Sequence, residues 1–179
     1  MTSTTATSMP IDPLVAPARA FAIKAHAGQL YGYEPYTVHL EAVHQVAVDF
    51  GLDVGIRAAT FLHDTVEDTG TLLEQLFDLF GHDVASLVWA VTGEGETRAD
   101  QVATAHAKIL GFATSRAALL KLCDRIANVE ASRRTSLRLW RRYREEQPAF
   151  EVLLDHHRVD GGEILERMRA RLRLAFLVV

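Results

Sequence analysis

The sequence has little or none of what marks several common classes of protein. Cys123 is the only cysteine among 179 residues, so the chain has neither an internal disulfide nor a cysteine-based metal site. We expect a buried thiol and a reducing, cytoplasmic environment. The opening MTSTTATSMP lacks the basic and apolar regions of a signal peptide, and residues 1–12 are predicted to form a disordered polar tail. The final LRLAFLVV is too short to span a membrane and contains Arg173.

An excess of basic residues is also missing. The chain has 19 Lys and Arg against 23 Asp and Glu, a net charge of −4, and so lacks the basic footprint of a duplex-binding protein. Arginines do gather in RRTSLRLWRRYR, where Leu137, Trp140 and Tyr143 are interleaved. We interpret this run as an amphipathic helix with its arginines turned outward. We therefore expect neither nucleic acid nor a membrane as a partner, and a homo-oligomer is left open.

What the sequence does contain is helical periodicity. With 49% hydrophobic and 23% charged residues, it fits one domain with a sizeable core, which we place at 13–179. Few β-branched runs occur, and breakers are spaced as in helix connections, which predicts an all-α, single compact multi-helix fold. The run TGEGETRADQ, residues 92–101, is the most loop-like interior segment and is a candidate for a mobile element beside a site. The expected helices cover about 14–29, 38–50, 54–68, 71–80, 83–92, 99–110, 115–132, 136–156 and 161–175.

Some helix boundaries depend on single residues. Pro35 breaks the chain and favours a new helix from about Thr37 or Val38. Thr71 and Glu74 have the spacing of a capping box at the start of a helix. Gly81 is then predicted to separate this helix from the next.

The stretch FLHDTVED, residues 61–68, carries four ionisable residues amid apolar neighbours. On a helix, His63, Asp64, Glu67 and Asp68 fall within an arc of about 140°. Burying these groups together is costly, because carboxylates lose hydration and repel one another. A divalent cation removes that cost, although a solvated acidic face with a satisfied histidine explains the stretch alone about equally well.

A second polar cluster lies in KLCDRIAN, residues 121–128. Helical spacing places Lys121, Asp124, Arg125 and Asn128 within about 100° of one another on one helix face. A carboxylate ligand, two cations and an amide donor suit a metal-bound phosphate. Taken alone, the segment is better explained as a surface ion-pair cluster, so its weight depends on the first stretch.

Histidines outside these stretches differ in how well they fit such a site. His39, in PYTVHL, falls in the first turn of a helix, and its candidacy rests on the other two segments. A second doublet, His82 and Asp83, has Ser86 and Leu87 where an acidic pair would be required. An acidic residue near a helix N-terminus explains Asp83 without a metal.

Together these segments resemble the metal-dependent HD phosphohydrolase superfamily, which is named after its His-Asp doublet. The order AHAGQ, EPYTVHLEAV, AATFLHDTVEDT, FGHDVASLV, KLCDRIANV is similar to the hydrolase domain of RelA/SpoT-type enzymes and to the stand-alone small alarmone hydrolases. The resemblance runs from about Ala18 to the middle of the helix that begins near Ser136. A single His-Asp pair is a weak signal, whereas the ordered set with an acidic pair one turn later is a strong one.

The resemblance implies a metal site. One divalent ion, manganese in this family, would be held by His39, His63, Asp64 and Asp124. Mixed imidazole and carboxylate ligands agree with such an ion on chemical grounds, and they do not exclude iron, zinc or magnesium.

The resemblance also implies a reaction. Glu67 and Asp68 match the acidic pair that orients and deprotonates the attacking water, and Asn128 matches a residue that helps to hold the nucleotide. Lys121 and Arg125 are expected to contact phosphate. The implied reaction removes pyrophosphate from the 3′ position of guanosine 3′,5′-bis(diphosphate), ppGpp or pppGpp, and leaves GDP or GTP.

One segment departs from the family pattern. Between GQ and PY the family usually has a basic stretch with an arginine that contacts guanine, whereas LYGYE is one residue shorter and has no arginine or lysine. Tyr31 or Tyr33 would stack on a purine instead, and stacking tolerates any base. Ala131 stands where the family often has a threonine near the substrate.

The departure keeps two other functions open. The same metal site would suit another phosphorylated nucleotide, such as an adenosine alarmone or a nucleotide with a terminal 2′ or 3′ phosphate like NADPH. The chain would alternatively be a metal-stabilised regulatory module without turnover. Retention of Glu67 and Asp68 argues against this module, because a structural metal site would not need that pair.

Overall fold

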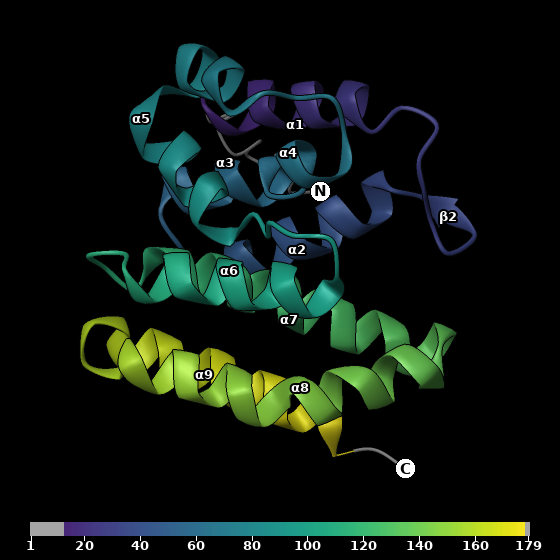
Figure 1. Cartoon of the computed structure of the whole chain (residues 1–179), viewed down its shortest axis with the longest axis vertical. Coiled ribbons are helices and arrows are strands. Elements are labelled where there is room, and N and C mark those ends of the chain that lie inside the picture. Colours follow the sequence, from purple (N-terminus) through teal and green to yellow (C-terminus); the bar gives the residue numbers. More distant parts are fainter. Residues whose placement is uncertain (1–12, 178–179) are drawn as a thin grey trace, which may run out of the picture.

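A computed structural model describes residues 13–177 of the chain (Figure 1). The polar tail expected over residues 1–12 lies outside the described residues, as do the last two residues of LRLAFLVV. The described part is almost entirely helical, so the all-α prediction is confirmed. Its elements are α1 (Val15–Ala25), β1 (Leu30–Tyr31), β2 (Glu34–Pro35), α2 (Thr37–Asp49), α3 (Val54–Leu62), α4 (Thr65–Asp68), α5 (Leu73–Val91), α6 (Arg98–Leu110), α7 (Arg116–Thr135), α8 (Leu137–His156) and α9 (Arg158–Phe176).

Helix α7 is the centre of the fold. It packs against α2, α3, α5, α8 and α9, and Leu120, Cys123 and Ile126 on it are fully buried. Burial of each such leucine or isoleucine contributes about 1.5–3 kcal/mol, so this helix is firmly fixed. In Figure 1, α8 and α9 lie side by side at one end of the molecule, and α1 and most of α5 lie at the other. Side chains that α7 projects between these layers are therefore held in place from several directions.

The LYGYE segment folds as a hairpin that the sequence did not predict. Leu30 pairs with Pro35 and Tyr31 with Glu34 in an antiparallel ladder. Gly32 takes a φ of 65° in the turn, a conformation that glycine adopts without a steric cost. Helix α2 then begins at Thr37, as the position of Pro35 predicted.

The expected helix over 54–68 is broken at the His-Asp doublet. Helix α3 ends at Leu62, and the short α4 begins at Thr65. The Thr65 hydroxyl donates to the Leu62 carbonyl oxygen at 2.7 Å, which satisfies an acceptor that the broken helix would leave free. No glycine or proline marks this break, so periodicity alone could not reveal it.

One other boundary differs from prediction, and one agrees with it. The capping box of Thr71 and Glu74 does not form, because α5 begins at Leu73 and the Gln75 side chain accepts from the Leu72 amide at 2.8 Å. Gly81 interrupts the helical backbone at φ 79° and ψ 170°, so α5 consists of two helical segments joined at a kink, and the predicted separation at Gly81 is confirmed.

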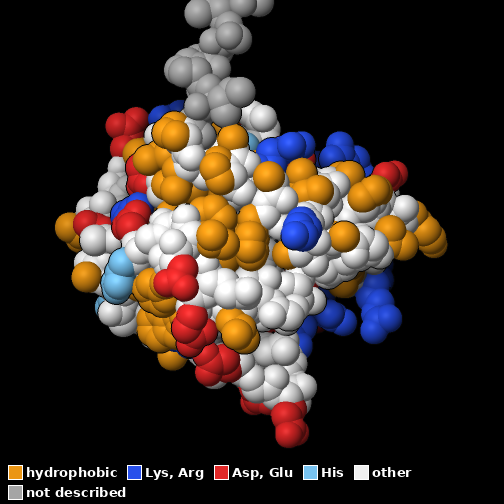
Figure 2. All heavy atoms as spheres, turned by 90° about the horizontal axis from the view of Figure 1, so that it is seen from above, with side chains coloured by type: hydrophobic (Ala, Val, Ile, Leu, Met, Phe, Trp, Pro, Cys, Tyr) orange, Lys and Arg blue, Asp and Glu red, His pale blue; other side chains and the backbone are white. Residues whose placement is uncertain are grey.

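The surface carries both signs of charge. Figure 2 shows one face, with hydrophobic side chains in the middle, Asp and Glu mainly to one side and Lys and Arg to the other. None of the helices within residues 13–177 is long and apolar enough to cross a bilayer.

Candidate metal centre and its polar pocket

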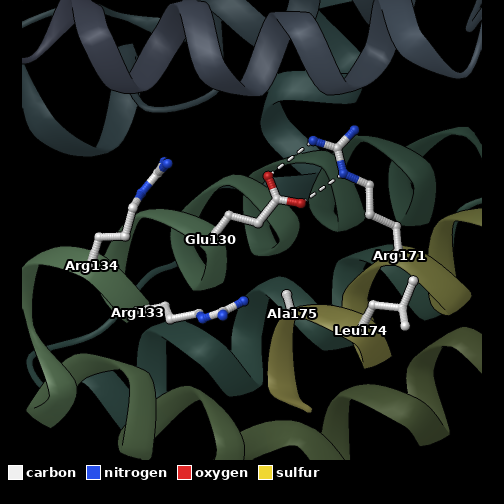
Figure 3. A pocket seen from close by; sticks show the side chains of 6 residues that line it. All are labelled: Glu130, Arg133, Arg134, Arg171, Leu174 and Ala175. Carbon is white, nitrogen blue, oxygen red and sulfur yellow. Dashed lines mark hydrogen bonds and ion pairs between the residues drawn. The ribbon is translucent and has the colours of Figure 1, made fainter. Parts of the chain in front are cut away.

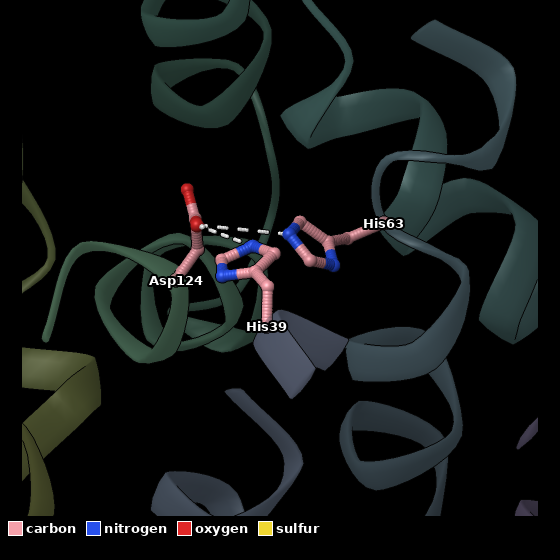
Figure 4. A group of neighbouring side chains, drawn as sticks. All are labelled: His39, His63 and Asp124. Carbon is pink, nitrogen blue, oxygen red and sulfur yellow. Dashed lines mark ion pairs between the residues drawn. The ribbon is translucent and has the colours of Figure 1, made fainter. Parts of the chain in front are cut away.

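Three of the four predicted metal ligands meet at the side of α7 (Figure 4). His39 from α2, His63 at the end of α3 and Asp124 from α7 each offer a ligand atom, and these atoms lie within 4.8 Å of one another. Both imidazoles point at the same carboxylate oxygen, with His39 Nε2 3.4 Å and His63 Nε2 3.6 Å from Asp124 Oδ1. All three side chains are buried or nearly so.

Asp64, the fourth predicted ligand, lies at the edge of this group. Its Oδ2 atom is 3.0 Å from His63 Nε2 and 3.5 Å from His39 Nε2. The Tyr36 hydroxyl donates to the same oxygen at 2.5 Å and holds it toward the imidazoles. Tyr36 was not among the predicted site residues, because its contribution depends on how α2 packs beside the broken end of α3.

The His63 ring is oriented for ligation. Its Nδ1 atom lies 2.8 Å from the Thr60 carbonyl oxygen, which only accepts, so in the neutral ring that a metal binds Nδ1 carries the proton and Nε2 carries the lone pair. Although Asp64 Oδ2 is within ion-pair distance, no hydrogen bond from any residue of the described range reaches Nε2. A buried, unpartnered nitrogen lone pair that faces two carboxylates fits a divalent cation.

The charges of the group are strongly coupled. Burial lowers the pKa of His63, but the carboxylates of Asp64 and Asp124 outweigh burial and raise this pKa to about 10. Burial raises the pKa of Asp64, and the neighbouring imidazoles outweigh it, so the carboxyl has a pKa well below its usual range. For Asp124, the effect of burial on the pKa is likewise outweighed, by Lys121 and then by the two imidazoles. Positive charge at this point therefore stabilises the two carboxylates. A divalent ion supplies that charge without protonation of the histidines.

The acidic pair Glu67 and Asp68 divides between two sides of the site. Glu67 lines a pocket that also contains Asp124, and its Oε2 accepts from the Gly93 amide at 2.8 Å. Burial raises the pKa of Glu67, in part offset by the Gly93 amide. Asp68 instead accepts from Gln29 at 3.0 Å. Only Glu67 of the pair therefore faces the pocket beside Asp124.

The predicted nucleotide-binding residues on α7 have different surroundings. Asn128 donates to Asp124 Oδ1 and accepts from the Tyr31 hydroxyl at 2.7 Å. Lys121 Nζ lies 3.3 Å from Asp124 Oδ2. Arg125 is buried, donates to Glu146 at 3.0 Å and stacks on the ring of Tyr143, so its guanidinium is already paired within the chain.

The two tyrosines of the hairpin are not equivalent. The Tyr31 ring stacks on the His39 imidazole, with centroids 4.8 Å apart and planes 17° apart. Tyr33 is fully exposed at the turn, and within residues 13–177 no hydrogen bond or ring contact joins it to the site. The structure therefore brings Tyr31, but not Tyr33, beside the predicted ligands.

The pocket beside Asp124 contains residues that the sequence did not predict. Arg98, at the start of α6, donates twice to the Glu146 carboxylate, at 3.0 and 3.2 Å. His106 and Tyr143 also line this pocket. The segment before α6 is anchored to the site, because Gly93 donates to Glu67, and Thr97 and Asp100 form a reciprocal capping box that begins α6 earlier than the expected end of the loop. The positive charge of Arg98 was the signal in the loop sequence that could have identified it as a site residue.

The second His-Asp doublet is remote from the metal group. Asp83 pairs with Arg116, which also binds Asp53 at 2.8 Å. His82 lies 3.1 Å from the Ser86 hydroxyl. This doublet takes part in a surface network, as its sequence context indicated, although an ion pair rather than helix-end electrostatics accounts for Asp83.

Comparison with known sequences identifies the class of protein. The family model of the HD domain matches residues 18–153, and the chain belongs to this family. The matched residues include the His-Asp doublet at the break between α3 and α4. HD domains bind a divalent metal, in agreement with the group formed by His39, His63 and Asp124.

Several curated relatives are named for a particular reaction. A probable guanosine-3′,5′-bis(diphosphate) 3′-pyrophosphohydrolase of Synechocystis sp. is 38% identical over 65% of this chain and 16% of its own length. A guanosine-3′,5′-bis(diphosphate) 3′-pyrophosphohydrolase of Aquifex aeolicus is 39% identical over 54% of this chain and 14% of its own length. A probable GTP pyrophosphokinase of Mycobacterium leprae is 34% identical over 74% of this chain and 20% of its own length. The chain thus spans a fifth or less of each of these curated relatives.

Solved structures share the fold over most of the chain. A metazoan ortholog of SpoT, described as hydrolysing ppGpp and playing a role in starvation responses, has a TM-score of 0.72 at 22% identity, over 96% of this chain and 100% of that chain. A crystal structure of a protein from Listeria monocytogenes has a TM-score of 0.61 at 18% identity, over 80% of this chain and 98% of that chain. At these identities the likeness concerns the fold alone.

Proposed function

We propose that this chain is a metal-dependent pyrophosphohydrolase that removes the 3′ pyrophosphate of guanosine 3′,5′-bis(diphosphate). The observation that carries the proposal is the convergence of His39, His63 and Asp124 beside a pocket that also contains Glu67. Relatives named for this reaction support the choice of substrate. Because the chain matches a small part of each relative, the substrate is part of the proposal.

The proposed ligands of the ion are the two imidazoles with Asp64 and Asp124. Manganese suits this mixed nitrogen and oxygen set. Bound here, the ion supplies Lewis acidity toward a phosphoryl oxygen and toward water. The chain itself fixes the ligands, through the Thr60 carbonyl behind His63 and the Tyr36 hydroxyl behind Asp64.

Glu67 is the proposed general base. Its carboxylate lines the pocket beside Asp124, and its raised pKa suits proton removal closer to neutral pH. In the proposed step the water oxygen bonds to the phosphorus attached to the 3′ oxygen, Glu67 takes one proton, and the bond between that phosphorus and the 3′ oxygen breaks. The 3′ oxygen takes up a proton, so GDP and pyrophosphate leave. Asp68 is proposed to orient the water, from its position beside Gln29.

The phosphate-binding groups are proposed on the same side. Lys121 lies next to Asp124, and Arg98 and Arg125 both pair with Glu146 at the pocket. We propose that a phosphoryl group recruits Lys121 directly, and that the two arginines contribute a positive field. Asn128, held between Asp124 and Tyr31, is placed to contact the ribose.

A second substrate, with adenine in place of guanine, is favoured by the hairpin. LYGYE brings no cationic side chain to the site, and Tyr31 presents only a ring and a hydroxyl. Such a surface has no group that distinguishes purines by charge.

The wider setting is proposed from the same basis. One HD-type domain over 13–179 acts in the cytoplasm on a small phosphorylated nucleotide, without nucleic acid or membrane as a partner. A homo-oligomer is compatible with this activity.

Product analysis by anion exchange tests the function. Purified protein with manganese is incubated with the guanosine alarmone, its adenosine counterpart or NADPH, and Asp64→Ala protein is the control. Pyrophosphate and GDP from the guanosine compound alone are expected. Turnover of another nucleotide would move the specificity to that compound, and no turnover of any would favour a binding module.

A further inference from the structure

An ion pair joins Glu130 of α7 to Arg171 of α9. Both oxygens of Glu130 on α7 are bound by Arg171 of α9, at 2.7 Å from Nε and 2.9 Å from Nη2 (Figure 3). Arg171 also donates to Asp49 of α2 at 2.7 Å. Glu130 is therefore fully engaged by a residue from another helix.

Because Arg171 binds both oxygens of Glu130, Arg134 does not pair with this carboxylate. Arg134 lies four residues after Glu130 on α7, and a glutamate followed by a cation at that spacing is the favoured helical ion pair. Figure 3 shows the Arg134 guanidinium apart from the Glu130 carboxylate, whose dashed lines run to Arg171. Among residues 13–177 no hydrogen bond or ion pair joins Arg134 to another residue, so its guanidinium keeps its full charge and all its donors.

Arg134 stands at a pocket that reaches the metal group. This pocket is lined by Tyr31, His39, Glu130, Ala131 and Arg134 among others, and shares no lining residue with the pocket that contains Lys121 and Arg98. Helical side chains lean toward the helix N-terminus, so the Arg134 side chain extends back toward Ala131. Along α7, Asp124 and Arg134 are about 15 Å apart, and the lean of the arginine shortens the gap between their polar atoms. The length of a nucleotide phosphorylated at both ends is of this order.

We propose that Arg134 is a specificity residue that binds the 5′-diphosphate end of the substrate while its 3′ pyrophosphate lies at the metal group. The inference rests on the proposed function and deepens it. An unpaired guanidinium recognises phosphate by charge and by paired N–H donors. Arg171 is a positioning residue, because it keeps the Glu130 carboxylate from neutralising Arg134.

The first experiment compares two substrates that differ only at the 5′ end. Values of kcat/KM are measured for guanosine 3′,5′-bis(diphosphate) and for guanosine 3′-diphosphate with a free 5′ hydroxyl. Arg134→Gln is expected to lower the preference for the 5′-phosphorylated compound about tenfold, mainly through KM. The matched control is Arg133→Gln, because Arg133 is also exposed and unpaired within the described residues but does not line the pocket beside His39. An unchanged preference in Arg134→Gln, or an equal loss in Arg133→Gln, would overturn the inference.

A binding measurement separates this inference from the proposed reaction. Calorimetric titration of the manganese-loaded chain compares GDP with guanosine, and needs no turnover. Arg134→Gln is expected to weaken GDP about tenfold relative to Arg133→Gln and to leave guanosine unchanged. If no substrate is hydrolysed but this difference is seen, the proposed reaction fails and the diphosphate site stands. If hydrolysis is seen and GDP binds both variants equally, the diphosphate site fails.

A third comparison tests the role of Arg171. Arg171→Gln releases Glu130 to pair with Arg134, so the preference for the 5′-phosphorylated substrate is expected to fall. Adding Glu130→Gln removes the competing carboxylate and is expected to restore the preference. A double variant as impaired as Arg171→Gln alone would show that Arg171 acts through the fold instead, and would reject its positioning role.

Discussion

Two buried polar clusters of this molecule differ in whether the chain completes them. Arg169 of α9 is 6% exposed, and its guanidinium donates to Asp155 at 2.8 Å, to Glu166 at 3.3 Å and to Glu151. In the metal group, carboxylates face the two imidazoles, and the paired cation, Lys121, contacts Asp124 Oδ2 at 3.3 Å rather than Oδ1, the oxygen that both imidazoles face. A cluster closed by its own arginine is structural, whereas one left open at its centre is suited to a ligand.

The largest expected effect is loss of the open cluster. Asp64→Ala removes a carboxylate that faces both imidazoles and is expected to abolish manganese binding and to lower hydrolysis at least about 10³-fold. Metal content by mass spectrometry and the hydrolysis rate are measured together. The control is Asp155→Ala in the closed cluster, which is expected to keep both. Stoichiometric manganese in Asp64→Ala would contradict the assignment of this ligand.

Next in size is the change of a residue that borders the open cluster without being a ligand. Glu67→Gln keeps the hydrogen bond from the Gly93 amide but cannot take a proton, so we expect bound manganese and a rate lowered about 10²- to 10⁴-fold. Asp68→Asn should lose less, because Asp68 faces Gln29 rather than the pocket. The pH–rate profile distinguishes the two variants. Full activity of Glu67→Gln would disprove the role of this residue as the base.

The closed cluster should respond in stability instead. Arg169→Met removes the buried cation that Glu151 and Asp155 share, and because Asp155 is partly exposed and Arg173 also lies near Glu151, we expect the free energy of unfolding to fall by about 1–2 kcal/mol. Urea denaturation measures this change, and the metal content is expected to stay equal to that of the wild type. A loss of manganese in this variant would show that the two clusters are coupled.

The sequence predicted these clusters unequally. His39, His63 and Asp124 are separated by up to 85 positions, and the ordered motifs that contain them resembled those of one family closely enough to bring all three into one site. The Arg169 cluster left no such signal, because an arginine near acidic residues on neighbouring helices is common. Tyr36, Arg98 and Glu146 were missed for a related reason, since their contacts arise only when α2, α6 and α8 are packed.

The fold was predicted best where a single residue determines the boundary of a helix. Pro35 placed the start of α2, and Ala117 to Ser132 fell within a helix as expected. The break at His63 and Asp64 was missed, because Thr65 and its neighbours are compatible with a helix, and the bend is held by the Thr65 hydroxyl on the Leu62 carbonyl and by the tertiary contact of Asp64 with Tyr36. Local propensity is weak beside such contacts.

The smallest expected effect concerns His106. Cations lie near this histidine, whereas carboxylates surround the histidines of the metal group. Burial first, and then the charges of Lys121 and Arg125, lower the pKa of His106 from 6.5 to about 4. The unfolded chain therefore binds the extra proton between these two values, so the contribution of neutral His106 to stability is complete above pH 6.5 and is lost as the pH falls toward 4. The free energy of unfolding changes between about pH 5 and about pH 7.5, and we expect this change to be smaller by about 1–2 kcal/mol in His106→Gln after allowance for solvent screening. Urea denaturation of both proteins at about pH 5 and about pH 7.5 measures it. Since other histidines titrate equally in both proteins, an identical change would mean that the cations near His106 do not control its protonation.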